Sequence, residues 1–438
     1  MEYPKNVYGY VFIGEQKFAF VLENFRLRIF NGITGFTFPK KINLDSVLFG
    51  LTDSNYNVAI KVGSSQQLTN CIVASVYYFV IGTANLIDYD LSKFYKVSFV
   101  GGNINSIIDP TIIHADDYFS EDYYKTFSIK FKSVEEVSCS VQTNINDTNV
   151  KFLRTIYPYQ KRKDNNLGVT NSALSFEFQE NQNISSLEKW IVFVYRLVSL
   201  LVGQKNIECE SCSIFFKTEQ GDGTAKVYFN LKQNEICDKK PIRCISLITL
   251  DNYLEKLLKL VADNEFSVGF LPETNDDAQY VTYEDIKNIC TALEFEYALS
   301  DICKQKNEDI KELVDKVKLV VKSFRETTTK LSEKFYQYIN SNIETWQCPA
   351  AEKFIALLKA NEILIRDVLK SKGEELTEDD IQKFVKCRNR ITHGDKPALD
   401  NSIAQTAFSL KYMIYIYILK RIGLYDDEIK NTLEFAWL

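Results

Sequence analysis

The first part of the chain contains short stretches in which hydrophobic and polar residues alternate. Residues 8–13 and 17–22 are mainly apolar, and residues 25–29 and 127–131 are apolar at every second position. A period of two is typical of strands that bury one face. Turn signals occur at Asn31-Gly32, Gly63-Ser64 and Gly101-Gly102. The pattern predicts a strand-rich region over residues 1 to about 180, built as a β-sandwich or as a barrel-like module.

A long apolar run then interrupts the strands and predicts an internal helix at about residues 186–202. The run follows Ser185-Ser186-Leu187-Glu188, which is similar to a capping signal, and Gly203 ends it as a C-cap. Strands resume over residues 212–231. Residues 250–261 again have a helical pattern, because Leu254, Leu257, Leu258 and Val261 fall on one face.

The last third of the chain has apolar residues at steps of three and four, which predicts helices. A polar stretch with a proline, residues 271–277, marks the domain boundary. We therefore predict an α+β protein in which a strand-rich domain at residues 1–270 precedes an all-α helical bundle at residues 276–438. The helices expected in the bundle cover residues 308–343, 351–371, 378–393, 399–422 and 426–435.

Composition and charge limit the function. The 438 residues include 52 Lys and Arg against 58 Asp and Glu, a formal net charge of −6, so the chain is no general nucleic-acid coat. The two longest apolar runs are interrupted by Arg196 and Lys411, and we expect core helices and no membrane attachment. The first four residues lack the pattern of a signal peptide, so we expect a cytoplasmic protein with reduced cysteines.

Metal chemistry has few candidate ligands. The chain has two histidines, His114 and His393, far apart in sequence, which disfavours a multi-histidine metal site. We interpret His114 as structural. A zinc site is one interpretation of Cys209, Cys212, Cys237 and Cys244, but buried cysteines fit their spacing better, and we expect no metal and no cofactor.

The most informative segment is the predicted helix at residues 378–393. Three acidic residues occupy its first turn, and Gly394 and Pro397 end it, so His393 is its last residue or its cap. Residues 383–396 hold five cations and one anion, a local charge of +4 in an acidic chain. Such a local positive patch suits a phosphate site better than a general nucleic-acid surface.

The residue types at this helix end suit cleavage of RNA. The Arg388 guanidinium can hold phosphate oxygens with its planar fork, and the His393 imidazole can move a proton to or from a ribose oxygen. Asn389 shares a face with His393, four residues on. Arg388 and His393 lie roughly 140° apart around the helix, so two copies facing each other would line one cleft better than one helix can.

The segment Arg388-Asn389-Arg390-Ile391-Thr392-His393 resembles the Arg-polar-x-x-x-His motif of HEPN ribonucleases. The order of the parts is similar to that of the ApeA-type anti-phage proteins: a strand-rich domain, an internal apolar helix near Trp190 and a C-terminal HEPN domain. The closing helix at residues 408–424 is similar in style to that family.

This resemblance implies a metal-independent endoribonuclease that dimerises through its HEPN domain. Arg388 and His393 would be catalytic and Asn389 would orient them, while Lys383, Lys386, Arg390 and Lys396 would contact the RNA. The products would carry 2′,3′-cyclic phosphate and 5′-hydroxyl ends. The family implies defence of a bacterial cell by abortive infection, with tRNA as the target and a phage-derived trigger sensed by the N-terminal domain.

Other interpretations remain. A non-catalytic HEPN module could bind a nucleotide, RNA or a protein partner through the same helix end. The N-terminal half could bind a glycan or a protein, with the helices as scaffold. We expect Cys387 to pack in the bundle, and we expect Glu294 and Glu296 to lie on a solvated or ion-paired face.

Overall fold

The computed structural model describes residues 4–30, 47–68, 71–83, 90–110, 114–115, 130–131, 138–145, 147–158, 170–219, 221–229, 244–274, 277, 280–327, 332–344 and 348–436. The chain divides into two compact units, Met1–Asp263 and Asn264–Ala436. This division falls a few residues before the polar stretch at 271–277 that the sequence pattern suggested. The first unit is rich in strands and the second is helical, which confirms the α+β fold class.

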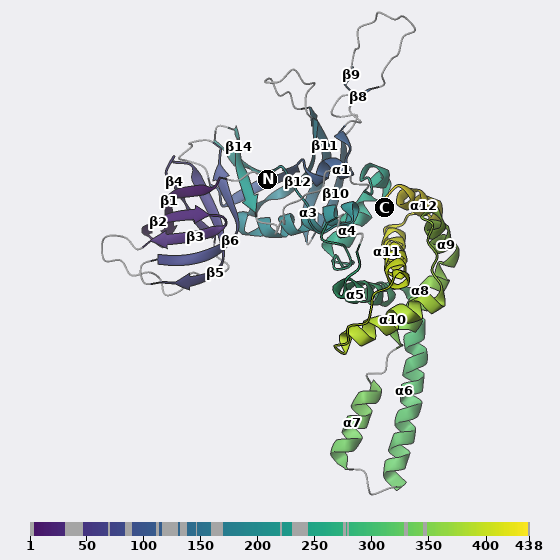
Figure 1. Cartoon of the computed structure of the whole chain (residues 1–438). Coiled ribbons are helices and arrows are strands. Elements are labelled where there is room, and N and C mark those ends of the chain that lie inside the picture. Colours follow the sequence, from purple (N-terminus) through teal and green to yellow (C-terminus); the bar gives the residue numbers. More distant parts are fainter. Residues whose placement is uncertain are drawn as a thin grey trace, which may run out of the picture. The chain divides into compact units, whose positions relative to one another are not determined.

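Six strands of the first unit form a closed antiparallel barrel (Figure 1). The pairing runs β6-β3-β2-β1-β4-β5 and returns from β5 to β6. Their alternating side chains fill the barrel with hydrophobic residues such as Val11, Phe20 and Ile60, so the barrel-like alternative is correct. The strands are β1 (Asn6–Ile13), β2 (Gln16–Glu23), β3 (Arg26–Phe30), β4 (Val47–Thr52), β5 (Asn57–Gln67) and β6 (Cys71–Gly82).

Two of the predicted turns can be compared with the structure. The turn predicted at Gly63-Ser64 is wrong, because both residues lie inside β5, where the pairing with β6 shifts register. A bulge accommodates the glycine there. Gly101-Gly102 is a turn, with positive φ at both residues. Asn31-Gly32 lies outside the described residues, as does most of the strand predicted at 127–131.

The sheet continues beyond the barrel through β6. Its order on that side is β14-β13-β7-β12-β11-β10, again antiparallel between neighbours. A separate two-stranded pair joins β8 (His114–Ala115) and β9 (Lys130–Phe131). The continuation comprises β7 (Lys93–Val100), β10 (Cys139–Ile145), β11 (Thr148–Pro158), β12 (Thr170–Asn183), β13 (Ser211–Thr218) and β14 (Gly221–Phe229).

The predicted internal helix is present as α3 (Leu187–Val202). Its Trp190 packs on Phe176 and Phe178 of β12. Gly203 ends it in the left-handed conformation, as predicted. Its start differs, because Asn183 caps a preceding 3₁₀ turn, Ile184–Ser186, and no serine side chain caps α3. The other helices of this unit are α1 (Asn103–Ile107), the 3₁₀ turn Ile248–Tyr253 and α4 (Leu254–Ala262).

The second unit packs several helices around α11 (Asn401–Ile422). Most residues of α11 between Ile403 and Ile422 are buried, and α5, α9, α10 and α12 contact it. The apolar run interrupted by Lys411 is therefore a core helix, as expected. The other helices are α5 (Tyr283–Leu299), α6 (Asp301–Thr327), α7 (Glu333–Glu344), α8 (Ala350–Ala360), α9 (Glu362–Ser371), α10 (Glu378–Thr392) and α12 (Asp426–Phe435).

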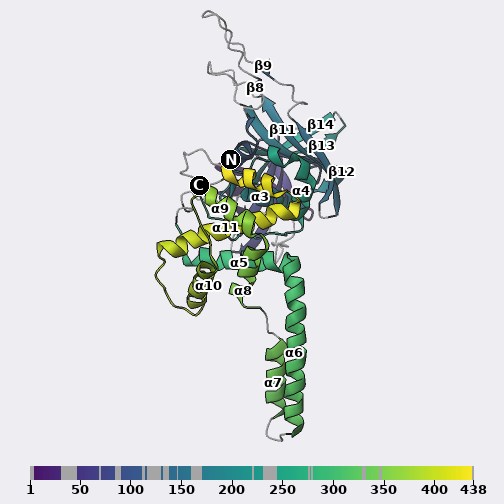
Figure 2. The same cartoon turned by 90° about the vertical axis from the view of Figure 1, so that its right-hand side faces the viewer.

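Two of the predicted helices are each divided in two. The helix expected at 308–343 consists of α6 and α7, which lie side by side and extend away from the other helices of the unit (Figures 1 and 2). The helix expected at 351–371 ends at Asn361, whose side chain accepts a hydrogen bond from Lys420 on α11. This break lets α8 pack on α5 and α9 pack on α12.

No described helix is both long and apolar enough to cross a lipid bilayer.

Candidate functional site

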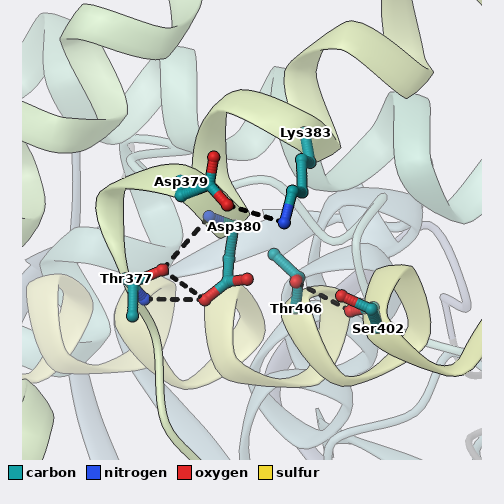
Figure 3. Close-up of polar contacts among 6 residues, drawn as sticks. All are labelled: Thr377, Asp379, Asp380, Lys383, Ser402 and Thr406. Atoms are coloured by element: carbon teal, nitrogen blue, oxygen red, sulfur yellow. Dashed lines mark hydrogen bonds and ion pairs between the residues drawn. The ribbon is translucent and has the colours of Figure 1, made fainter.

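The N-terminal end of α10 is fixed by a capping box (Figure 3). The Asp380 backbone donates to Thr377 Oγ1 at 3.2 Å, and the Thr377 backbone donates to Asp380 Oδ2 at 3.0 Å. Glu378 and Asp379 add negative charge where the helix dipole is positive. The acidic first turn predicted from the sequence therefore sets where α10 begins.

The C-terminal end of α10 is a Schellman motif. The Gly394 amide donates to the Ile391 carbonyl at 3.1 Å, and the Asp395 amide donates to the Arg390 carbonyl at 3.0 Å. Gly394 has a φ of +92°, which favours glycine. His393 is the C-cap residue, so the prediction that glycine stops this helix is confirmed.

One side of α10 is held by the rest of the unit. Ile381, Phe384, Val385 and Cys387 are buried, and the helix contacts α5, α8 and α11. Cys387 is a packed core residue, as predicted, and burial raises the pKa of its thiol. The segment after α10 is anchored as well, because the Tyr283 hydroxyl of α5 donates a hydrogen bond to the Pro397 carbonyl at 2.8 Å.

Arg388 lies between α10 and α5. Its Nη2 donates to Glu294 Oε1 at 3.0 Å, and its Nη1 donates to Asn389 Oδ1 at 3.2 Å. The Arg388 side chain is 25 % exposed, so this ion pair is partly shielded from water. The structure therefore brings Arg388, Asn389 and Glu294 together, and Glu294 lies on an ion-paired face, as expected.

A buried thiol lies close to Arg388. Burial raises the pKa of Cys290 on α5 to about 12, while the Arg388 guanidinium acts in the opposite direction. Burial thus favours the neutral form of this thiol.

His393 stands apart from that cluster. His393 is exposed at the end of α10. Its ring has no hydrogen-bond or ion-pair partner in the part of the chain that the structure describes. Among those residues, no hydrogen bond joins the His393 side chain to the Arg388 side chain. An exposed imidazole at a capped helix end is open to an incoming ligand.

The four other cations of the segment differ in their pairing. Lys383 pairs with Asp379 at 2.6 Å (Figure 3), and Arg390 pairs with Asp395 at 3.4 Å, both on the surface. Such exposed pairs are weak and exchange readily for a phosphate. Lys386 and Lys396 are exposed and, among the described residues, form no ion pair.

A buried ion pair joins α5 to α11. Arg421 of α11 donates with both Nη atoms to the carboxylate of Glu296 and also donates to the backbone carbonyl of Glu265. The Glu296 side chain is 1 % exposed, and burial raises its pKa while Arg421 opposes that shift. The sequence placed Glu296 on a solvated or ion-paired face. The structure buries it in an ion pair, and no pattern in the sequence pointed to its partner Arg421, 125 residues away.

The remaining sequence candidates lie in the first unit. His114 is in β8, and its register partner is Phe131. Burial raises the pKa of Cys209 to about 12, and the Cys244 thiol donates to the Ser106 carbonyl at 2.7 Å. Cys237 lies outside the described residues. Within the described part of the chain, no three His, Cys, Asp or Glu residues are grouped as metal ligands.

Comparison with known proteins finds no match: no protein-family model, no curated protein and no solved structure is similar enough to this chain to assign a family.

Proposed function

We propose that the chain is a metal-independent endoribonuclease of the HEPN type that acts as a homodimer. The proposal rests on one observation, the arrangement at the end of α10. There, a guanidinium oriented by Glu294 and Asn389 and an exposed imidazole occur on one rigid helix end in the Arg-polar-x-x-x-His order. The local positive charge suits an RNA phosphate.

The chemistry needs one base, one acid and one phosphate ligand. One His393 takes the proton of a ribose 2′-hydroxyl, whose oxygen attacks the adjacent phosphorus. The bond from phosphorus to the 5′-oxygen breaks, and the protonated His393 of the other copy gives its proton to that oxygen. Arg388 holds the non-bridging oxygens as their charge increases. The products carry 2′,3′-cyclic phosphate and 5′-hydroxyl ends.

The residues around this centre would bind the rest of the RNA. Lys386 and Lys396 are open to phosphates, and Lys383 and Arg390 would exchange their surface carboxylates for phosphates. We further propose tRNA as substrate, the cytoplasm of a bacterial cell as location and abortive infection as the role. A phage-derived trigger would act through the N-terminal unit.

Sequencing of RNA ends tests the activity. Cells expressing the wild-type chain should accumulate 2′,3′-cyclic phosphate ends at defined sites, and His393→Ala should abolish them. The matched control is His114→Ala, which removes the other histidine and should leave the cleavage sites unchanged. Cyclic-phosphate ends that persist in His393→Ala, with the protein expressed at the same level, would refute the assignment.

A binding module without activity is the second candidate. The pairing of Arg388 with Glu294 favours it, and so does the absence of a hydrogen bond between the Arg388 and His393 side chains among the described residues. In that case the purified chain would bind RNA and lose affinity on substitution of Lys386 and Lys396. It would leave RNA ends unchanged with or without phage infection.

A further inference from the structure

The outer surface of the barrel carries large aromatic side chains where polar ones are usual. β1 exposes Tyr8, Tyr10 and Phe12, with 48 %, 45 % and 44 % of their areas open to solvent. On the adjacent β4, Phe49 is 38 % exposed and is the register partner of Phe12. These four residues form what we call the aromatic face. Antiparallel strands ordinarily place polar residues on their solvent side, so the aromatic face has no role in the barrel core.

The spacing of the rings follows from the strands. Alternate residues of one strand are ~6.8 Å apart, and neighbouring strands are ~4.8 Å apart. Tyr8, Tyr10 and Phe12 therefore form a row along β1, and Phe49 extends that row sideways. The register partners of Tyr8 and Tyr10 on β2 are Val21 and Ala19, which are short side chains.

Cations lie beside the rings. Lys17 Nζ is 4.1 Å from the centroid of the Tyr10 ring. Arg28 on β3 is the register partner of Val21, which in turn pairs with Tyr8, so Arg28 is two strands or ~10 Å from that ring. Among the described residues, neither Lys17 nor Arg28 forms an ion pair.

On the strands themselves, the outward positions hold more cations than carboxylates, while Glu15 and Asp53 lie in the flanking turns. The outward positions of the described strands β1, β2, β3, β4 and β6 hold three cations and one carboxylate, whereas the whole chain has a net charge of −6. The carboxylate, Glu23, is the register partner of the third cation, Arg26. A ligand for this surface should therefore combine flat apolar groups with negative charge.

We infer that the aromatic face binds single-stranded nucleic acid. Bases would stack on Tyr8, Tyr10, Phe12 and Phe49, and phosphates would lie toward Lys17 and Arg28. Stacking on aromatic rings beside a basic strip is how proteins hold unpaired strands with little sequence preference. A neutral glycan would also contact such rings, but it would have no use for the neighbouring cations. The inference does not depend on the proposed ribonuclease activity.

Fluorescence anisotropy of the full-length chain with a labelled oligodeoxythymidylate of about twelve nucleotides tests this inference. DNA lacks the 2′-hydroxyl, so the mechanism proposed for His393 cannot degrade the probe. The wild type should bind saturably. Tyr10→Ala/Phe12→Ala should weaken binding by about tenfold or more, because two stacking rings are lost. Lys17→Ala/Arg28→Ala should reduce the salt dependence of log K by about 0.7 for each lost phosphate contact.

The matched control removes two exposed aromatic residues elsewhere. Phe335→Ala/Tyr338→Ala acts on α7, where the two rings are 54 % and 64 % exposed, and it should leave binding unchanged. All these positions are exposed, and circular dichroism of each variant verifies the fold. The inference is overturned if the wild type does not bind the probe, if the β1 variant binds as well as the wild type, or if a neutral oligosaccharide binds in place of DNA.

Discussion

At the scale of single residues, the candidate site depends on how Arg388 is held. Glu294 and Asn389 each accept a hydrogen bond from one Nη atom, so the guanidinium has a preferred orientation before any ligand arrives. Arg388 is partly buried, and electrostatic interactions are stronger there than in water. A poorly oriented guanidinium would therefore lose more interaction energy with a bound phosphate than it would at a fully exposed site. In the proposed reaction Glu294 would thus orient Arg388. Its hydrogen bond to Arg388 can be tested separately from its negative charge.

Glu294→Ala should lower RNA cleavage by about tenfold, since a charge-assisted hydrogen bond is lost. Glu294→Gln keeps an oxygen that accepts from Arg388 and should retain most of the activity. Rates of cleavage of a labelled RNA measure both. Glu284→Ala, which removes an exposed carboxylate from the start of α5, is the control and should cleave like the wild type. Equal rates for Glu294→Ala and the wild type would contradict this role.

The buried pair of Arg421 and Glu296 makes a different prediction. Arg421→Ala leaves a carboxylate buried without its partner and should lower the free energy of unfolding of the helical unit by about 3–5 kcal/mol. Chemical unfolding followed by helical circular dichroism measures this loss. Lys359→Ala breaks the exposed pair with Glu378 and should change stability by less than about 1 kcal/mol. Similar losses in the two variants would argue against a structural role for the buried pair.

At the scale of elements, α9 and α10 end in the same way. Gly373 and Gly394 both have positive φ, and each follows its helix in a Schellman motif. A Cβ added at either glycine would have open space around it. The two helix ends differ in the residue before the glycine, which is His393 before Gly394 and Lys372 before Gly373. This makes one helix end a control for the other.

Gly394→Ala and Gly373→Ala should each cost about 1–2 kcal/mol, since alanine is strained in the left-handed region. Only Gly394→Ala should also lower RNA cleavage, because a changed helix end moves the His393 ring. Thermal unfolding and cleavage rates of both variants separate the two effects. A loss of cleavage in Gly373→Ala equal to that in Gly394→Ala would mean that stability, not the position of His393, limits activity.

At the scale of the whole molecule, the proposed reaction needs two copies of the chain. Each copy has one histidine at the helix end, and the reaction uses a base and an acid at the same time. Arg388 and His393 are five residues apart on α10 and are not joined within the described residues of one copy. A homodimer would thus supply the second histidine that the proposed site needs.

Mixing experiments test this requirement. When wild-type and His393→Ala chains are exchanged in equal amounts, only about a quarter of the dimers contain two intact histidines. Activity should then fall to about a quarter of that of an all-wild-type sample at the same total concentration. If each copy works independently, half the activity remains. Subunit exchange is verified with differently tagged chains.

Much of the fold and of the helix end could be predicted from local patterns. Periods of two and of three to four separated strands from helices, and Gly203 and Gly394 marked helix ends correctly. Local patterns failed where distant contacts decide. The turn predicted at Gly63 is wrong because a shift in the register of β5 against β6 accommodates this glycine within the strand. The break between α8 and α9 lies at Asn361, which accepts a hydrogen bond from the distant Lys420 of α11.

What the sequence determined by itself is therefore the kind of each element and the chemistry available at the end of α10, because periodicity, capping residues and residue type are local properties of the chain. The tertiary structure decided which distant residues meet. It closed six strands into a barrel, paired Arg388 with Glu294 and Arg421 with Glu296, and placed Phe49 of β4 beside Phe12 of β1. Such contacts depend on packing between segments far apart along the chain, which no local pattern records.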